Sequence, residues 1–580
     1  MQPSSSRKSL RSNEFISHTN DRCQNDGEEP GGAQVGPVGH YRAGVGILFR
    51  SFLAVKRMND MTQIKIYDTT LRDGTQMEGV SLSLADKLAI TTELDLLGVH
   101  YIEGGFPVSN PKDEEYFREA AKLDLKSARI VAFGMTRRAK NTAEEDHTLN
   151  AMLASQAPVV AVVGKSWDFH VRDVLRVSLE DNLAMIEDSV RFLKKAGREV
   201  VFDSEHFFDG YAANSEYALK TLEAAAAGGA DWLALCDTNG GRLPGEITAA
   251  VKDVAARFDT PIAIHCHNDG ALGVANSLAA VEAGATMVQG TINGFGERCG
   301  NADLTAIVPN LAIKMKREVM SQENLKRMTE VSRFVWDLAN FMIPSNQPFV
   351  GASAFAHKGG MHGHAVARDT RTYEHIEPAQ VGNERHILIS ELSGTANVQK
   401  KLASLGLQVD KDLIRKILDE VQNLENDGYQ FEAADGSFAL LVRRLAGTAK
   451  DFFELEGYRV TITRDTKGSP VTEASVKIKV GDEQRHTVAE GDGPVNAFDG
   501  ALRKALEDIY PALKEVHLVD YKVRVVNPRA ATAAKVRVVI ESQDHSEVWG
   551  TVGVSENIIE ASYKALADSI VYKLMKEQDV

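Results

Sequence analysis

The sequence predicts an α/β protein built on a (β/α)8 barrel, followed by a helical linker region and a C-terminal α+β domain. From residue 64 to about residue 335, short runs of β-branched and apolar residues alternate with helix-like stretches, a pattern typical of parallel strands. Eight such units over about 270 residues match this barrel, for which roughly 250 residues is usual. Polar residues fall where the runs end, and chemistry gathers at those strand ends in such a barrel. A doubly wound open sheet is the alternative, but no GxGxxG follows the first run.

The predicted strands come in order along the chain. They are Ile64–Thr69, Val99–Gly104, Ile130–Gly134, Val159–Gly164, Val200–Asp203, Trp232–Asp237, Ile262–His267 and Met287–Thr291. The helical stretches between them include Ala85–Leu97, Leu179–Ala196, Ser215–Gly228 and Ser277–Gly284. We therefore expect residues 61–335 to form the barrel domain.

The first 60 residues differ from this pattern. They contain Ser4-Ser5-Ser6, Pro30-Gly31-Gly32 and scattered charges without periodicity, a composition typical of disorder. We expect residues 1–60 to be a disordered extension. The alternative is that translation naturally starts at Met58 or Met61.

Two further regions are expected beyond the barrel. Residues 336–450 read as linker subdomains, rich in Gly and His up to about 395 and helical at Val398–Leu405 and Lys411–Asn423. Residues 451–580 read as two βββα units. The first unit is Tyr458–Thr463, Ala474–Val480, Gln484–Ala489 and helix Val495–Ile509; the second is Val516–Val526, Lys535–Glu541, Glu547–Val554 and helix Glu556–Met575. A duplicated module apart from the barrel favours ligand sensing or dimerisation, and a purely structural cap is the alternative.

Composition excludes several classes of function. The 580 residues include 66 basic and 81 acidic ones, for a net charge of −15, which disfavours a nucleic-acid or membrane-surface binder. No run is long and apolar enough to span a bilayer. The four cysteines show no CxxC spacing, so a reducing cytoplasm is expected.

One group of residues predicts a metal site. Arg72 and Asp73 follow the first strand, where a cation and a carboxylate can bind an anionic substrate and a metal together. Taken alone, the pair is more often a surface ion pair. His265 and His267 are two residues apart on a strand and therefore share a face. Two imidazoles and a carboxylate can hold Zn²⁺, Mn²⁺ or another divalent ion, and Asn301, after the eighth strand, offers a further oxygen.

Three other residues are candidates for catalysis and binding. Glu205 follows the fifth strand and can act as an acid or base, and the Thr238 hydroxyl follows the sixth and can bind a substrate carboxylate. Capping of the strand ends is the alternative for both. His362 lies in the Gly- and His-rich segment 357–364, outside the barrel repeat, and is a candidate proton shuttle. A flexible surface loop is the alternative for that segment.

Together these residues resemble a known family. Leu71–Gln76 (LRDGTQ), His265–Asp269 (HCHND) and Gly296–Ala302 (GERCGNA) are similar to signatures of the DRE-TIM metallolyases, specifically the α-isopropylmalate/homocitrate synthase family. Tyr373–Ile376 and Val381–Arg385 resemble that family's linker, and the duplicated C-terminal module resembles its leucine/isoleucine-sensing domain. The resemblance covers about residues 64–575.

The resemblance implies a metal-dependent Claisen condensation of acetyl-CoA with a 2-oxoacid. Asp73, His265 and His267, with Asn301, would hold the divalent ion (Zn, Mn or Mg), and Thr238 would bind the 2-oxoacid carboxylate. Arg72 would stabilise the developing oxygen charge. Glu205, relayed with His362, would take a proton from the acetyl methyl group, and water would then release CoA.

The resemblance also bears on the acceptor and on regulation. The threonine in Arg72–Gln76 (RDGTQ) and the run Asp203–Gly210 (DSEHFFDG) favour pyruvate as the acceptor, with 2-oxoisovalerate as the alternative. Feedback by isoleucine and a homodimer are implied too. A lyase that cleaves a hydroxy acid on the same barrel is less favoured, because of the long C-terminal region. A non-catalytic amino-acid sensor is disfavoured, because the Arg, Asp and His residues are intact.

Overall fold

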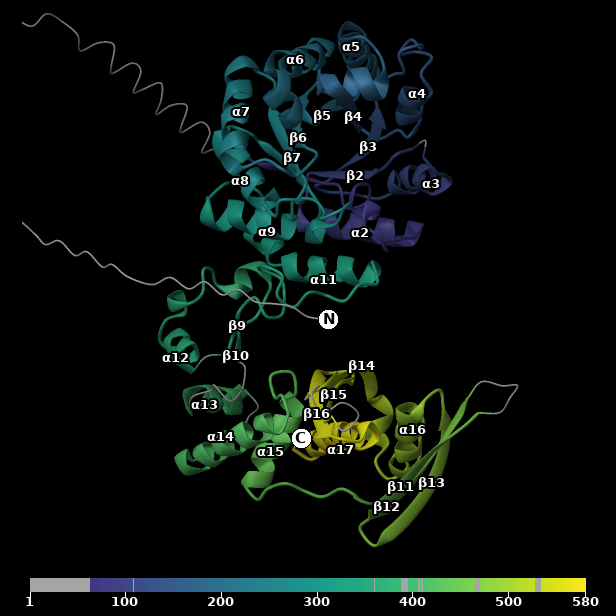
Figure 1. The fold of residues 1–580 in the computed structure, drawn as a ribbon, viewed down its shortest axis with the longest axis vertical. Coiled ribbons are helices and arrows are strands. Elements are labelled where there is room, and N and C mark those ends of the chain that lie inside the picture. Colours follow the sequence, from purple (N-terminus) through teal and green to yellow (C-terminus); the bar gives the residue numbers. More distant parts are fainter. Residues whose placement is uncertain are drawn as a thin grey trace, which may run out of the picture. The chain divides into compact units, whose positions relative to one another are not determined.

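The computed structural model describes residues 63–579, except residues 108, 359, 388–394, 405–406, 408–409, 465–469 and 527–533. Residues 1–60, which we predicted to be disordered, lie outside the described part. Eight strands close into a barrel in sequence order (Figure 1). They are β1 (Lys65–Asp68), β2 (Tyr101–Gly105), β3 (Arg129–Met135), β4 (Val159–Lys165), β5 (Glu199–Glu205), β6 (Trp232–Asp237), β7 (Ile262–Cys266) and β8 (Met287–Gly290). Strand β1 pairs in parallel with both β2 and β8, so the predicted barrel is confirmed and the open sheet is excluded.

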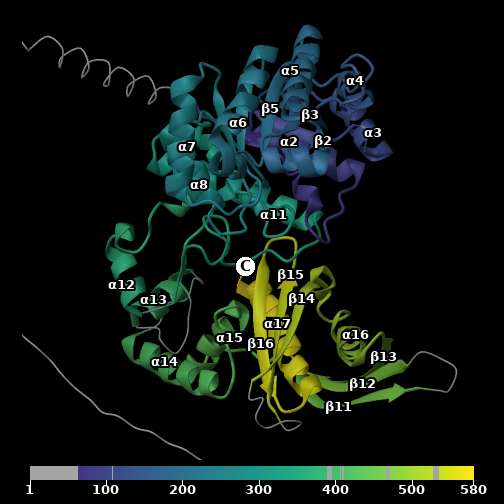
Figure 2. The same ribbon diagram turned by 45° about the horizontal axis from the view of Figure 1, so that its top comes forward.

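The barrel helices lie outside the strands (Figures 1 and 2). They are α2 (Leu84–Leu97), α3 (Pro111–Ala120), α4 (His147–Ala154), α5 (Leu179–Lys195), α6 (Phe207–Gly228), α7 (Pro244–Arg257), α8 (Gly273–Ala283) and α9 (Leu304–Pro309); one-turn elements are η1 (Gly74–Gln76), η2 (His170–Leu175), η3 (Ile292–Gly294) and η4 (Asn310–Lys314). Helix α6 begins earlier than the predicted Ser215. Asn214 has the non-helical angles φ −153° and ψ 79°, so the helix is broken there. The predicted start at Ser215 matches the segment that follows this break.

Alternation along the strands separates two apolar layers. Inside the barrel, Tyr67, Val131, Val201 and Met287 belong to one compact cluster. Neighbouring strand residues such as Ile66 and Phe202 face the helices in the larger core. Because both strand faces are buried, the strands read as continuous apolar runs.

The linker elements follow the barrel. They are α10 (Gln322–Leu325), α11 (Met328–Leu338), β9 (Ala356–His357), α12 (Gly360–Arg368), η5 (Thr370–Thr372), η6 (Pro378–Val381), β10 (His386–Ile387), α13 (Thr395–Ser404), α14 (Lys411–Asn426) and α15 (Asp435–Leu445). Strands β9 and β10 pair in parallel as a small separate sheet. Segment 357–364, for which a flexible loop was one expectation, instead contributes to β9 and the start of α12.

The C-terminal region contains the two predicted βββα units. The first is β11 (Glu454–Thr463), β12 (Val471–Val480), β13 (Glu483–Gly491) and α16 (Pro494–Leu506); the second, after η7 (Pro511–Glu515), is β14 (His517–Val525), β15 (Val536–Gln543), β16 (Val548–Ser555) and α17 (Ile558–Asp579). Each unit forms an antiparallel three-stranded sheet. Helix α15 packs on the second unit, because Ser437 on α15 accepts a hydrogen bond from Val552 N and donates one to Asp568. Among the described residues, no helix has the length and apolarity needed to cross a membrane.

Candidate active site

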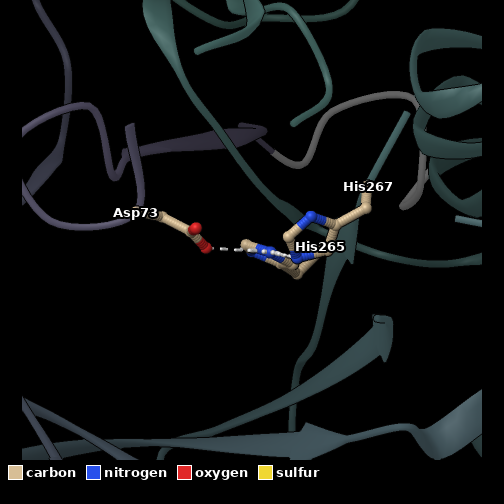
Figure 3. A group of neighbouring side chains, drawn as sticks. All are labelled: Asp73, His265 and His267. Carbon is tan, nitrogen blue, oxygen red and sulfur yellow. Dashed lines mark hydrogen bonds and ion pairs between the residues drawn. The ribbon is translucent and has the colours of Figure 1, made fainter. Parts of the chain in front are cut away.

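Three predicted ligands meet at the C-terminal ends of the barrel strands. His265 lies on β7, His267 just beyond it, and Asp73 in the turn after β1 (Figure 3). Their ligand atoms all lie within 4.8 Å of one another, and all three side chains are buried. His265 Nε2 is 3.4 Å from His267 Nε2 and 3.6 Å from Asp73 Oδ2. Ligand atoms that share one ion at bonds of about 2.1 Å lie roughly 3.0–3.5 Å apart, so this spacing fits a divalent cation.

The charge states of these groups also fit a cation. Burial lowers the pKa of His265, and burial followed by repulsion from His265 lowers the pKa of His267 to about 4. Both imidazoles are therefore neutral near pH 7 and can bind a metal. Burial opposes ionisation of Asp73, but its charged and hydrogen-bonding neighbours, Arg72 foremost, outweigh burial and hold the pKa of Asp73 below its ordinary value.

Asn301 lies beside this cluster with an unused oxygen. Its Nδ2 donates to Phe295 O at 3.0 Å, while its buried Oδ1 has no hydrogen-bond partner. A bridge between the backbones of His267 and Asn301 joins the two segments. Gly296 permits this approach, because a Cβ there would lie 2.2 Å from Asn301 Nδ2. A buried amide oxygen without a donor is costly unless something else binds it, and a cation would do so.

Arg72 is held between two carboxylates. Its Nε donates to Glu103 Oε2 at 2.7 Å, and its Nη1 lies 3.1 Å from Asp73 Oδ2. The guanidinium also lies over the Phe133 ring, 4.0 Å from the ring centroid. The Arg72 side chain is thus fixed in one orientation at the rim.

Glu103 is a site residue to which sequence reasoning gave no role. It is fully buried on β2 and accepts hydrogen bonds from Tyr67 OH at 2.8 Å and from Thr69 Oγ1, besides that from Arg72. Three donors from β1 and the turn after it thus converge on its carboxylate. The available signal was a carboxylate in the middle of an otherwise uncharged buried strand, Tyr101–Gly105.

A cavity of about 290 Å³ opens beside these residues. Its lining brings together most of the predicted site: Arg72, Asp73, Glu205, Thr238, His265 and His267, with Phe133, Lys165 and Asp203 among the others. Glu205 forms an ion pair with Lys165. Thr238 Oγ1 accepts a hydrogen bond from His206 N at 2.8 Å, so the Thr238 hydroxyl proton remains to be donated elsewhere.

His362 is a predicted site residue that the described lining of the cavity does not contain. It lies on α12, is exposed, and stacks on Tyr373 with ring centroids 4.0 Å apart. The described residues that line the cavity do not include His362. Its role as a proton shuttle therefore stays a prediction.

Comparison with known proteins defines the class of enzyme first. Residues 63–335 match the HMGL-like family, residues 349–428 the homocitrate synthase post-HMGL domain-like family, and residues 432–574 the LeuA allosteric (dimerisation) domain. The barrel and its rim are thus those of an HMGL-like enzyme, a class whose members use a divalent metal.

Relatives that match over nearly their whole length then identify the family within this class. The chain is 53% identical to the (R)-citramalate synthase of Aquifex aeolicus, over 89% of this chain and 99% of the relative. It is 51% identical to the (R)-citramalate synthase of Geobacter sulfurreducens, over 90% of this chain and 99% of the relative. A probable 2-isopropylmalate synthase of Methanopyrus kandleri is 33% identical over 88% of this chain and 98% of the relative. The chain belongs to the (R)-citramalate synthase family.

Proposed function

We propose that this chain is an acyltransferase that condenses acetyl-CoA with pyruvate and water to give (R)-citramalate and CoA. The observation that carries the proposal is the 53% identity across 99% of an (R)-citramalate synthase. The buried group of Asp73, His265 and His267 supports it, since the reaction needs the ketone of pyruvate to be polarised.

The cation site has four proposed ligands. Asp73, His265, His267 and Asn301 would hold a divalent ion, either Zn²⁺, Mn²⁺ or Mg²⁺. When bound, such an ion supplies Lewis-acid polarisation of the 2-oxoacid carbonyl. The neutral imidazoles and the ionised carboxylate make the chain ready to bind it.

Thr238 and Arg72 are the proposed anion-binding groups. Because Thr238 Oγ1 already accepts from His206 N, its proton is available to the carboxylate of pyruvate. Arg72 uses one N–H for Glu103 and one for Asp73, so further N–H groups of the guanidinium remain for the oxyanion that forms during condensation.

Glu205 is the proposed base. It lines the cavity as a partly exposed carboxylate beside Lys165 and can accept a proton from the acetyl methyl group. Loss of that proton makes the acetyl carbon nucleophilic; the new C–C bond forms at the ketone carbon of pyruvate, and water then cleaves the thioester. His362 would assist as a proton relay once it is brought to the cavity.

The proposal extends to regulation and organisation. The match of residues 432–574 to the LeuA allosteric (dimerisation) domain supports dimerisation and allosteric regulation through this region, and we propose a homodimer with isoleucine as the feedback effector. We place domain boundaries near residues 61, 336 and 451, although the packing of α15 on the second βββα unit favours an earlier start for the last domain. Cysteine usage supports a cytoplasmic location.

The test is product analysis with purified full-length protein. Acetyl-CoA, pyruvate and a divalent metal should give stoichiometric CoA and (R)-citramalate, and chelation should abolish both. Pyruvate-dependent CoA release without citramalate would contradict the proposal. Cleavage of a hydroxyacyl-CoA instead would identify a lyase, and no reaction with any 2-oxoacid would support the sensor alternative.

The second candidate is 2-isopropylmalate synthase, which would use 2-oxoisovalerate. The relative with that name that matches 88% of the chain supports it, but at 33% identity. The larger acceptor would need more space beside the cation site, in the cavity that Arg72 and Phe133 line.

A further inference from the structure

A chain of hydrogen bonds joins His265 to two residues that lie on other strands. His265 Nδ1 is 3.0 Å from Gln289 Oε1, and Gln289 Nε2 donates to Asp203 Oδ1 at 3.1 Å. The three residues lie on β7, β8 and β5 and are at most 5% exposed. His265 and Gln289 are direct partners in the strand register, whereas β5 and β8 are not neighbours, so the second bond crosses the barrel interior.

The chemistry of the groups sets the direction of these bonds. A glutamine amide has one end that donates and one that accepts. When Asp203 is ionised, its Oδ1 can only accept, so the NH₂ of Gln289 faces Asp203 and donates to it. The Gln289 oxygen then faces His265 and can only accept there, which places the imidazole proton on Nδ1.

This direction matters for the cation site. With its proton on Nδ1, His265 presents the lone pair of Nε2, the atom that faces Asp73 and His267. The opposite tautomer carries a proton on Nε2 and cannot bind a cation there. The second imidazole has no such support, because His267 Nδ1 is buried without a partner among the described residues.

We infer that Gln289, itself oriented by Asp203, is a positioning residue that fixes the ring and tautomer of His265 for cation binding. This inference rests on the proposed cation site, but not on which 2-oxoacid reacts. Groups that orient a metal-binding histidine typically change metal affinity by 10- to 100-fold when they are altered.

Three substitutions at Gln289 separate positioning from general packing. Gln289→Met keeps the volume but removes the acceptor for His265 Nδ1. Gln289→Asn keeps an amide but is one methylene too short to reach both partners, and it serves if Gln289→Met does not fold. Gln289→Glu keeps an acceptor for Nδ1–H, and because two carboxylates this close hold one proton between them, it also keeps a donor to Asp203. Thr91→Val is the matched control, because it removes a buried hydrogen bond to Tyr116 away from the site.

The measurement is Zn²⁺ or Mn²⁺ binding to full-length protein stripped of metal, by calorimetry, with thermal unfolding as a check of folding. We expect Kd to rise 10- to 100-fold in Gln289→Met and Gln289→Asn, and to stay within about threefold of wild type in Gln289→Glu and Thr91→Val. An unchanged Kd in a folded Gln289→Met or Gln289→Asn protein would overturn the inference. So would an equal loss in Gln289→Glu and Gln289→Met.

The outcome can be separated from that of the proposed function. Metal affinity is measured without acetyl-CoA or a 2-oxoacid, so a wild-type protein that binds metal but makes no citramalate leaves the inference testable. Conversely, wild-type protein could be found to make citramalate while the Gln289 variants bind metal as tightly as wild type. That result would reject the role of Gln289 and leave the proposed function standing.

Discussion

Acidification should destabilise the metal-free barrel through His267. Burial, and then repulsion from His265, lowers the pKa of His267 to about 4, whereas a histidine in the unfolded chain titrates near 6.5. As the pH falls below about 6.5, His267 therefore becomes protonated in the unfolded chain while it stays neutral in the folded barrel. The free energy of unfolding falls across this window and levels off below about pH 4.

The size of this loss follows from the two pKa values. Between pH 7 and pH 5 the difference in proton uptake amounts to about 2 kcal/mol of unfolding free energy from His267 alone. Other histidines and the carboxylates titrate as well, so the absolute pH profile contains more than this contribution. The variant His267→Asn removes it, and the difference between the two profiles isolates it.

The assay is urea unfolding of the metal-free protein at pH 7, 6 and 5, followed by tryptophan fluorescence. Wild type should lose about 2 kcal/mol more than His267→Asn over this range. The exposed His147→Asn on α4 controls for loss of a histidine and should follow the wild-type profile. Parallel profiles for wild type and His267→Asn would refute the argument, since they would mean that the imidazole is protonated as easily in the barrel as in the unfolded chain.

Further predictions concern the neighbouring residues and the C-terminal region. Glu103→Leu should destabilise the barrel by about 3 kcal/mol, because Arg72 loses one of its two buried carboxylate partners, whereas Glu103→Gln, which can still accept from Arg72, should lose less than half as much. Equal shifts of both variants in thermal unfolding would contradict this. Asp73→Ala should abolish CoA release and weaken metal binding at least tenfold, as measured by calorimetry. Full activity in this variant would contradict the assignment of Asp73 as a ligand of the cation. Deleting residues 451–580 should relieve inhibition of CoA release by isoleucine, and an unchanged inhibition curve would speak against the sensing role.

The barrel could be predicted because its strands are short, buried on both faces and separated by helices. Those features leave a signal in the order of apolar runs, and all eight strands appear within a few residues of their predicted positions. The side chains at the strand ends followed from the same reasoning. His265 and His267 share a face because strand periodicity is two, and a closed barrel brings the end of β1 beside the end of β7.

The contacts between side chains could not be predicted in the same way. Glu103 and Gln289 are single polar residues inside buried strands, and their meaning depends on which donors reach them from other strands. The free oxygen of Asn301 follows from the backbone path of the loop around Gly296, which is set by three-dimensional packing. His362 lies on α12 and is not among the described residues that line the cavity, and the local sequence carries no signal for this.

The central claim is that the acceptor is pyruvate. Its most direct test is kcat/KM for CoA release from saturating acetyl-CoA, measured with pyruvate and with 2-oxoisovalerate on the same full-length, metal-loaded preparation. We predict a clear preference for pyruvate, with (R)-citramalate as the product. A preference for 2-oxoisovalerate would contradict it and assign the chain the activity of a 2-isopropylmalate synthase.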